Sequence, residues 1–385
     1  MKRWTIDRRA MVTVGLAALL GACSVIPKGA DRAGPVVTTP TPEPTQSLPS
    51  DETRHRIALL VPMSGTNGAV GQSIANATTM ALLDTNASNL RITSYDTAKG
   101  PEAAARQAIA EGNKLILGPL LGSNIPSITA TARAADVPVI SFSNDTGAAG
   151  PDVLIMGHIP EQSIMRTVQY ARSRGSQNFA IIAPDGEYGA RAEEAARRAV
   201  AAYGGTMVWT ERYARGNTSI VSAAERLKAH GGYDTVLIAD GARLAAQAAG
   251  VLKPRAGGVP QLLGTELWSG EGSVTRASAL RGALFSAVSD NRYKRFVDSY
   301  EARFGSQPYR IATLGYDAVL LTLRVARDWR VGRDFPDRAL RSEDGFLGLD
   351  GAFRFGPNGL VERAFEVREV RDGAVVVVEN APARF

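Results

Sequence analysis

Short apolar runs alternate with helical segments along most of this chain, and this alternation constrains its fold more than any other feature. Apolar runs at 56–61, 115–117 and 179–182 are each followed by a segment with the character of a helix. Strands that alternate with helices in this way form parallel sheets whose two faces are covered by helices. The pattern therefore predicts an α/β fold.

The alternation occurs in two series and then breaks down. The second series starts at Pro160, and after a strand at about 284–288 two helices follow one another at 291–304 and 310–327. The chain ends with two strands joined by Asp372-Gly373, a typical hairpin turn. We therefore expect two lobes with more than one crossing between them: a first lobe of 55–158 plus about 285–345, and a second lobe of 159–284 plus about 346–380.

The N-terminus has the pattern of an export signal. Four basic residues precede an apolar run at 10–20, which is too short to span a bilayer but suits the core of a signal peptide. Leu20-Gly21-Ala22-Cys23 resembles a bacterial lipobox, so residues 1–22 are expected to be removed and Cys23 to carry the lipid. The alternatives are a plain signal peptide with an incidental cysteine and, for the export route, a twin-arginine signal at Arg8-Arg9. Ser24 after the cysteine resembles the sorting pattern for the outer rather than the inner membrane.

Residues 23–54 are predicted to be a tether. They are rich in proline and threonine and show no apolar period. Such a segment favours extended geometry at roughly 3.1 Å per residue, so thirty residues reach on the order of 90 Å.

Charge and composition exclude several classes of function. The chain has 385 residues with 44 Lys and Arg against 38 Asp and Glu, a net charge of +6. The leader holds four of the basic residues and one acidic residue, and the remaining net charge of +3 does not suggest nucleic-acid binding. One cysteine and three scattered histidines provide no metal cluster, and we expect no cofactor.

The loops that follow the predicted strands hold the candidate site. In open α/β sheets, ligands bind beyond the carboxyl ends of the strands. The alternative interpretation is that the serine, asparagine and aspartate side chains in these loops only cap helices. The predicted cleft residues are Ser64, Gly65, Gly118, Ser123, Ser141, Ser143, Asn144, Asp145, Asp185, Tyr188, Asp240, Glu266 and Trp268.

Enzymatic chemistry is poorly supported by the same loops. Gly65, Gly68 and Gly71 have the spacing G-x-x-G-x-x-G, which is not the dinucleotide-binding fingerprint, and no Walker A lysine follows. There is no G-x-S-x-G motif, and no histidine lies near a candidate serine in the sequence. We therefore expect a protein that is not an enzyme.

Several loops carry a family resemblance. Val61-Pro62-Met63-Ser64-Gly65, Gly118-Pro119 and Asp185-Gly186-Glu187-Tyr188-Gly189 resemble the periplasmic binding proteins of type 1, in the leucine-binding branch. The resemblance implies two Rossmann-like lobes with parallel sheets and a ligand cleft between them. Within that branch, Ser141-Phe142-Ser143-Asn144-Asp145, Gly264-Thr265-Glu266-Leu267-Trp268 and Leu314-Gly315-Tyr316-Asp317-Ala318 are similar to the penicillin-binding protein activators. Those are outer-membrane lipoproteins that stimulate peptidoglycan synthases.

The sequence also departs from both patterns. Asp145 stands where members that bind amino acids often have threonine, and two carboxylates 4 Å apart repel by about 1–4 kcal/mol. Tyr188 matches an aromatic residue that contacts the ligand in those members. The enterobacterial activators carry a helical-repeat domain before this fold, whereas here the proline-rich tether stands in that place.

Two functions remain open at this point. The first is a lipid-anchored periplasmic regulator that activates a bifunctional penicillin-binding protein. The alternative is the solute-binding component of an ABC-type uptake system, which would hold an amino acid or a related small polar ligand.

Overall fold

The computed structural model describes residues 53–216, 219–253 and 259–382. The predicted signal peptide, Cys23 and the tether up to residue 52 lie outside these ranges. Residues 50–385 form one compact unit. No helix in the described part of the chain combines the length and the apolar content that a membrane span requires.

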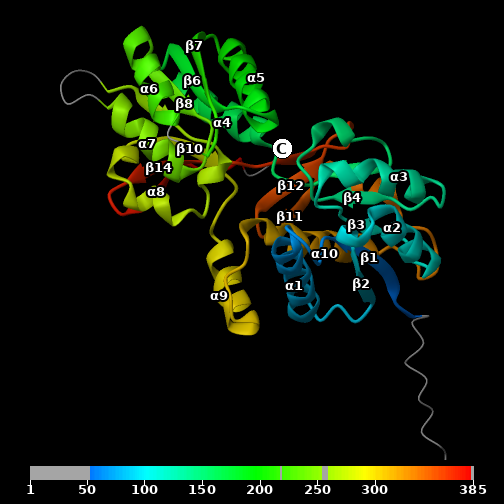
Figure 1. The fold of residues 1–385 in the computed structure, drawn as a ribbon. Helices are drawn as coiled ribbons and strands as arrows, with labels where there is room; N and C mark the ends of the chain where they lie inside the picture. Colours follow the sequence, from blue (N-terminus) through cyan, green and yellow to red (C-terminus); the bar gives the residue numbers. More distant parts are fainter. Residues whose placement is uncertain (1–52, 217–218, 254–258, 383–385) are drawn as a thin grey trace, which may run out of the picture. The chain divides into compact units, whose positions relative to one another are not determined.

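Two sheets, each with its own helices, organise this unit, and we call them the first and the second lobe (Figure 1). The first lobe has a parallel sheet in the order β2-β1-β3-β4-β5, and a small antiparallel sheet β11-β12-β13. Its elements are β1 (His55–Val61), α1 (Gly68–Asp84), β2 (Leu90–Asp96), α2 (Pro101–Ala110), β3 (Ile116–Leu117), α3 (Ile125–Arg133), β4 (Val139–Ser141), β5 (Val153–Ile155), α9 (Tyr293–Phe304), α10 (Thr313–Ala326), β11 (Phe346–Gly348), β12 (Gly351–Phe355) and β13 (Val361–Arg363).

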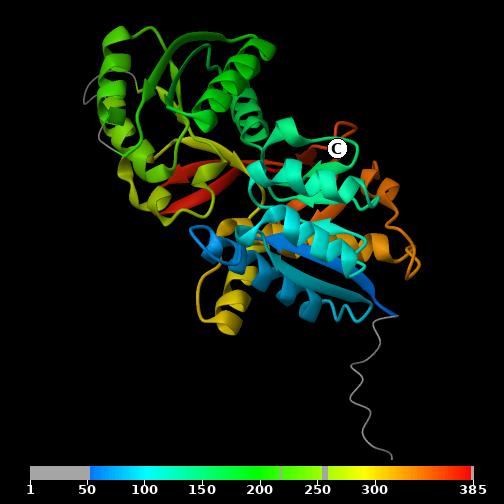
Figure 2. The ribbon, with the colours of Figure 1, turned by 45° about the vertical axis from the view of Figure 1, so that its right-hand side comes forward.

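The second lobe has a mixed sheet in the order β15-β14-β10-β9-β8-β6-β7. The C-terminal strands, red in Figure 2, complete it as the predicted hairpin, and β14 runs antiparallel to β10. The elements are α4 (Pro160–Ser173), β6 (Asn178–Pro184), α5 (Glu187–Ala202), β7 (Thr206–Tyr213), α6 (Ser219–His230), β8 (Thr235–Ile238), α7 (Ala242–Leu252), β9 (Gln261–Leu263), α8 (Gly272–Arg276), β10 (Leu284–Ala287), β14 (Glu366–Arg371) and β15 (Ala374–Glu379).

Burial explains why the apolar runs became central strands. The five residues from Ile57 to Val61 are completely buried, because helices cover both faces of the sheet. The helices begin and end at expected residues: α2 and α4 have proline at their first position, and α9 ends at Gly305 with φ of +71°.

The predicted lobe boundaries near the C-terminus need correction. β10 was assigned to the first lobe, but it pairs with β9 and β14 in the second sheet. Residues 346–363 were assigned to the second lobe, but Phe346, Phe353 and Val361 lie in the core of the first lobe. The chain therefore crosses between the lobes at about 156–159, 288–292 and 364–365.

Strand register brings the candidate loops together within each lobe. Leu59 of β1 lies opposite Leu117 of β3, which in turn lies opposite Ile140 of β4. The loops that follow these strands therefore meet at one edge of the first sheet. In the second sheet, the pairing of β6, β8 and β9 does the same for the loops that follow them.

Candidate functional site

The hydroxyl groups of the first lobe are largely engaged in shaping their own loops. Ser64 lies after β1, and its Oγ donates to Asp96 Oδ2 at 2.7 Å. Ser141 Oγ donates to the carbonyl of Pro119 at 2.9 Å and accepts the N–H of Ser143 at 3.1 Å. Ser143 Oγ accepts the N–H of Asp145 at 3.0 Å.

Asp145, the predicted departure from amino-acid binders, acts as a cap. Its Oδ1 accepts the N–H of Gly147 at 3.0 Å, at the start of a short 3-10 helix (Thr146–Ala148). The structure therefore bears out the capping interpretation for this residue. Ser123 and Asn144 are exposed at the same edge, so they remain accessible to a ligand.

Gly118 has a structural role at this edge. It is buried with φ of +106°, and a Cβ atom there would lie 2.1 Å from the carbonyl oxygen of Leu60. Only glycine permits β3 to pass β1 at this distance. Gly65, by contrast, has φ of +68° and open space where a Cβ atom would stand, and its carbonyl accepts the N–H of Gly68 at 3.0 Å.

The second lobe presents a different kind of surface, centred on Glu266. This residue begins the short 3-10 helix Glu266–Trp268 after β9. Tyr188, in the first turn of α5, shares a hydrogen bond of 3.0 Å with Thr265 Oγ1 and donates to Glu266 Oε1 at 3.4 Å. Glu266 Oε2 is buried, and it has no hydrogen-bond partner among the described residues.

Burial dominates the electrostatics of this cluster. It raises the pKa of the Glu266 carboxyl to about 7 and, with the nearby charge of Glu266, raises the pKa of Tyr188 well above its usual value. The charge of Glu161 also raises the pKa of Glu266, whereas Arg191 lowers it. A ligand that donates an N–H or carries a positive charge would satisfy the free carboxylate oxygen.

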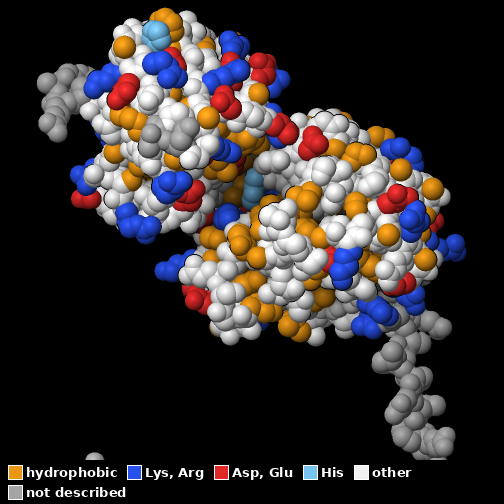
Figure 3. Space-filling model, viewed as in Figure 1, with side chains coloured by type: hydrophobic (Ala, Val, Ile, Leu, Met, Phe, Trp, Pro, Cys, Tyr) orange, Lys and Arg blue, Asp and Glu red, His pale blue; other side chains and the backbone are white. Residues whose placement is uncertain are grey.

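An ion pair flanks Glu266 on the helical side. Arg191 of α5 contacts both carboxylate oxygens of Glu161 of α4, at 2.8 and 2.9 Å. The negative charges of Glu161, Glu187 and, less strongly, Asp145 of the first lobe raise the pKa of Arg191. The surface is hollowed between the lobes in Figure 3. The sequence contains no local pattern that indicates this pair, because thirty residues separate its members.

Asp240, after β8, is held by internal partners. It accepts hydrogen bonds from the hydroxyl of Tyr213 and, at 2.8 Å, from Arg215 Nε. Its backbone carbonyl accepts the indole N–H of Trp268 at 2.9 Å. Trp268 is only 1% exposed, and Ser141 is completely buried. These two predicted cleft residues therefore do not face a ligand and instead pack beneath the surface of the loops. Asp185 is exposed at the end of β6.

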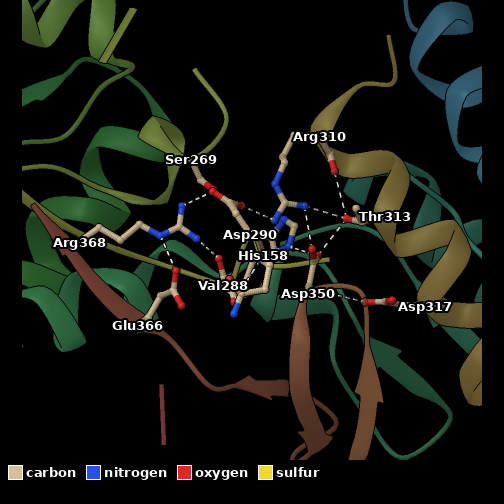
Figure 4. A network of polar contacts seen from close by, with 12 residues as sticks. His158, Ser269, Val288, Asp290, Arg310, Thr313, Asp317, Asp350, Glu366 and Arg368 are labelled. Atoms are coloured by element: carbon tan, nitrogen blue, oxygen red, sulfur yellow. Dashed lines mark hydrogen bonds and ion pairs between the residues drawn. The ribbon is translucent and has the colours of Figure 1, made fainter. Parts of the chain in front are cut away.

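A network of charged side chains lies where the chain crosses between the lobes (Figure 4). Asp350 is completely buried, and its carboxylate contacts His158 Nε2 at 2.8 Å, Arg310 Nη1 at 2.7 Å and Thr313 Oγ1 at 2.9 Å. Burial alone would raise the pKa of Asp350, but Arg310 and His158 hold it well below its usual value. Burial lowers the pKa of His158. The hydrogen bond and the charge of Asp350 raise it again, but only in part.

The same network includes the other two crossings. Asp290 follows β10 and contacts Arg368 of β14, and its Oδ1 lies 3.7 Å from Arg310 Nη2. Arg363 ends β13 and donates to the carbonyl of Met156 at 2.9 Å. The ion pair between Asp290 and Arg310 therefore joins the second crossing to the contacts of Asp350, and the bond from Arg363 to Met156 joins the third crossing to the first.

The serine and histidine side chains at the strand ends bond to other groups of the chain. His158, the histidine at a strand end, bonds to Asp350, while Ser64, Ser141 and Ser143 bond to other partners. Within the described ranges, no group of three or more His, Cys, Asp or Glu side chains could hold a metal ion.

Known proteins resemble this chain at three levels. A family model described as periplasmic binding protein matches residues 55–374. An uncharacterized protein of Rickettsia prowazekii (strain Madrid E) is 31% identical over 134 residues, covering 34% of this chain and 36% of that protein. Penicillin-binding protein activator LpoA of Glaesserella parasuis serovar 5 (strain SH0165) is 26% identical over 141 residues, covering 36% of this chain and 24% of that protein. The chain thus aligns with about a third and a quarter of the length of these two relatives.

Among solved structures, a putative branched-chain amino acid ABC transporter from Rhodospirillum rubrum has a TM-score of 0.72 at 21% sequence identity. The match covers 84% of this chain and 100% of that chain. At this level of identity, the similarity establishes a shared fold.

Proposed function

Because the chain belongs to the periplasmic binding protein family, with the type 1 fold, we propose that it is a periplasmic regulator that activates a peptidoglycan synthase. The proposed partner is a bifunctional penicillin-binding protein. In this proposal the chain performs no catalysis, and a lipid on Cys23 anchors it to the outer membrane.

The observation that carries this proposal is the local identity with the activator from Glaesserella parasuis, 26% over 141 residues. The geometry of the first lobe supports it. Ser64, Ser141 and Ser143 hold their own loops together, so fewer hydroxyls are free to bind a ligand carboxylate. A domain of this fold with fewer groups available for a small ligand is suited to act through a protein partner.

Reconstituted glycan polymerisation tests the proposal. The full-length chain, purified in detergent, is added to a bifunctional penicillin-binding protein from the same organism, and the rate of polymerisation or crosslinking is measured. We expect a rate increase of several-fold and a complex between the two proteins. If the synthase neither binds the chain nor changes its rate, the proposal is wrong.

A second candidate function rests on the unpaired oxygen of Glu266. A buried carboxylate oxygen without a partner is unfavourable, and a ligand N–H or ammonium group would satisfy it beside Tyr188. This observation favours a solute-binding protein of an uptake system for amino acids or related small polar ligands.

A thermal-shift screen separates this candidate from the first. Amino acids, amides and peptidoglycan fragments are tested for an increase in Tm, which a specific ligand must produce by stabilising the folded state. Glu266→Gln should abolish the increase, whereas Glu194→Gln on the exposed face of α5 should retain it. If no compound raises the Tm, solute binding is not the function of this site.

A further inference from the structure

A basic surface lies around the amino end of β1 in the first lobe. A pocket of about 320 Å³ lies at the amino end of β1, with Arg54, His55, Arg56 and Lys114 in its lining together with Trp329. Arg56 Nη1 donates to a backbone carbonyl, that of Glu111, at 2.9 Å, so this contact leaves its charge uncompensated. Lys114 pairs with Asp334, whose side chain is 67% exposed and therefore well hydrated.

This pocket contains a buried polar atom without a partner. His55 is 4% exposed, and its ring stacks on that of Trp329 with 4.0 Å between the ring centroids. Its Nδ1 is buried and forms no hydrogen bond within the described part of the chain. Burial lowers the pKa of His55, which favours the neutral ring, and the tautomer with hydrogen on Nδ1 carries an unused donor.

A second groove continues the surface. It has a volume of about 510 Å³, and its lining combines Leu320, Leu323 and Leu347 with Arg324 and Arg327 of the α10 region. The backbone N–H of His55, in the lining of the pocket, bonds to the carbonyl of Asn89, in the lining of the groove, at 2.8 Å, so the two cavities are neighbours. We call the two cavities together the entry face.

The entry face combines positive charge with exposed apolar groups. The charged side chains in the lining of its two cavities are all Lys or Arg. Arg324 and Arg327 are exposed, and they form no ion pair with any described residue. Leu347 is 59% exposed and Val331 is 41% exposed. Interfacial surfaces of this composition bind anionic lipids, because arginine pairs with headgroup phosphates while aliphatic groups enter the boundary below.

We propose that the entry face docks the folded unit onto an anionic phospholipid surface. The place of the face in the chain favours a membrane over a soluble partner. β1 starts at His55, so the residues before it, including the predicted lipid attachment at Cys23, join the folded unit at this face. If a lipid on Cys23 is inserted in a membrane, that membrane is an extended surface to which the entry face can bind. This docking is independent of which function the cleft serves.

Vesicle co-sedimentation tests the proposal with the chain from Ser24 to Phe385, which contains the compact unit of residues 50–385 and carries no lipid. Vesicles of phosphatidylethanolamine with one quarter phosphatidylglycerol are compared with vesicles of phosphatidylcholine alone. We expect binding to the anionic vesicles at 50 mM NaCl, weakening at 300 mM as salt screens the charges. Equal binding to both vesicles, or to neither, would overturn the proposal.

Matched variants locate the binding. Arg324→Ser with Arg327→Ser should weaken binding to the anionic vesicles at least fivefold, because each basic residue near such a surface contributes to the affinity. Arg243→Ser with Arg276→Ser removes the same charge from exposed residues of the second lobe and should leave binding within twofold. If both pairs weaken binding equally, net charge alone is responsible and the entry face is not a docking site.

The apolar contribution has its own pair of variants. Leu347→Ser should weaken binding measurably, whereas Val377→Ser, at an exposed strand position of the second lobe, should not. Each variant is first shown to retain the Tm of the unchanged chain, so that a loss of folding cannot imitate a loss of binding.

Discussion

The carboxyl ends of the two sheets face the same site but are built differently. In the first lobe, neutral hydroxyls and backbone N–H groups satisfy one another, as Ser141 and Ser143 illustrate. In the second lobe, charged and phenolic groups meet in buried surroundings, and one carboxylate oxygen of Glu266 has no hydrogen-bond partner in the part of the chain that the structure describes.

This difference indicates where recognition resides. In the first lobe, the hydroxyls of Ser64, Ser141 and Ser143 gain little from a ligand, because they already bond to groups of their own lobe. In the second lobe, Glu266 Oε2 needs a hydrogen-bond donor that the described residues do not supply. A small molecule that binds in the hollow would therefore be recognised by its donor group at Glu266. The network at the crossings, centred on Asp350, connects the two lobes and should matter most for stability.

The largest expected effect is that of Asp350→Ala. Removal of this carboxylate leaves the partly buried Arg310 without its closest partner and frees His158, and loss of one member of a buried ion pair costs about 3–5 kcal/mol. Urea unfolding measures the change in the free energy of unfolding. Asp372→Ala, which breaks an exposed pair with Arg281, is the control and should change it little. Equal effects would mean that the network at the crossings has no special role.

The next effect concerns the two glycines of the first lobe. Gly118→Ala places a methyl group against the carbonyl of Leu60 and should lower the free energy of unfolding by roughly 3 kcal/mol. Gly65→Ala meets no neighbour and should lower it by only about 1 kcal/mol, the cost of its positive φ. Thermal and urea unfolding of both variants provide the comparison. A smaller loss for Gly118→Ala than for Gly65→Ala would contradict the structural role assigned to Gly118.

Glu266 should make stability depend on pH. Burial raises its pKa to about 7 in the folded chain, so the folded state holds its proton more tightly than the unfolded state does. This contribution to stability is complete below the ordinary carboxyl pKa of 4.5 and is lost as the pH rises through about 7. Glu266→Gln should therefore be more stable than the unchanged chain at pH 8, by on the order of 2 kcal/mol.

Unfolding of both proteins at pH 5 and pH 8 measures this difference. It should shrink toward zero at pH 5, where the carboxyl is protonated in the folded chain. A difference that does not change with pH would show that Glu266 lies in water-like surroundings and that the contrast between the lobes is overstated.

The smallest effect is expected for Tyr188→Phe. The change removes hydrogen bonds to Thr265 and Glu266 and should lower the free energy of unfolding by about 1 kcal/mol. Tyr203→Phe, at the end of α5, removes a hydroxyl for which the described residues provide no hydrogen bond and serves as the control. No difference between the two would indicate that Tyr188 is not part of the second-lobe cluster.

The sequence predicted the fold well because strand and helix periods are local signals. The runs that became β1, β6 and β8 are apolar and buried, and the hairpin of β14 and β15 follows from the turn at Asp372-Gly373. The small sheet β11-β12-β13 was missed, because its strands are short and interrupted by glycines. That omission also displaced the predicted lobe boundary.

The sequence identified residues at strand ends as the candidate site, and their role in binding stays a prediction. Strand ends identified Tyr188, Asp240 and Glu266, because loops that follow neighbouring parallel strands must meet. The sequence could not show that Trp268 is buried, since its burial follows from packing in the second lobe. Ion pairs such as Glu161 with Arg191, and Asp350 with Arg310, join residues 30 and 40 positions apart and leave no local pattern.

Crosslinking in living cells followed by mass spectrometry tests the central proposal most directly. A photo-crosslinking residue is placed at exposed positions of the full-length chain in its own organism, and the captured proteins are identified. The account predicts a bifunctional penicillin-binding protein among the crosslinked partners. Capture of the membrane subunits of an ABC transporter, with no peptidoglycan synthase, would contradict it and would favour solute uptake instead.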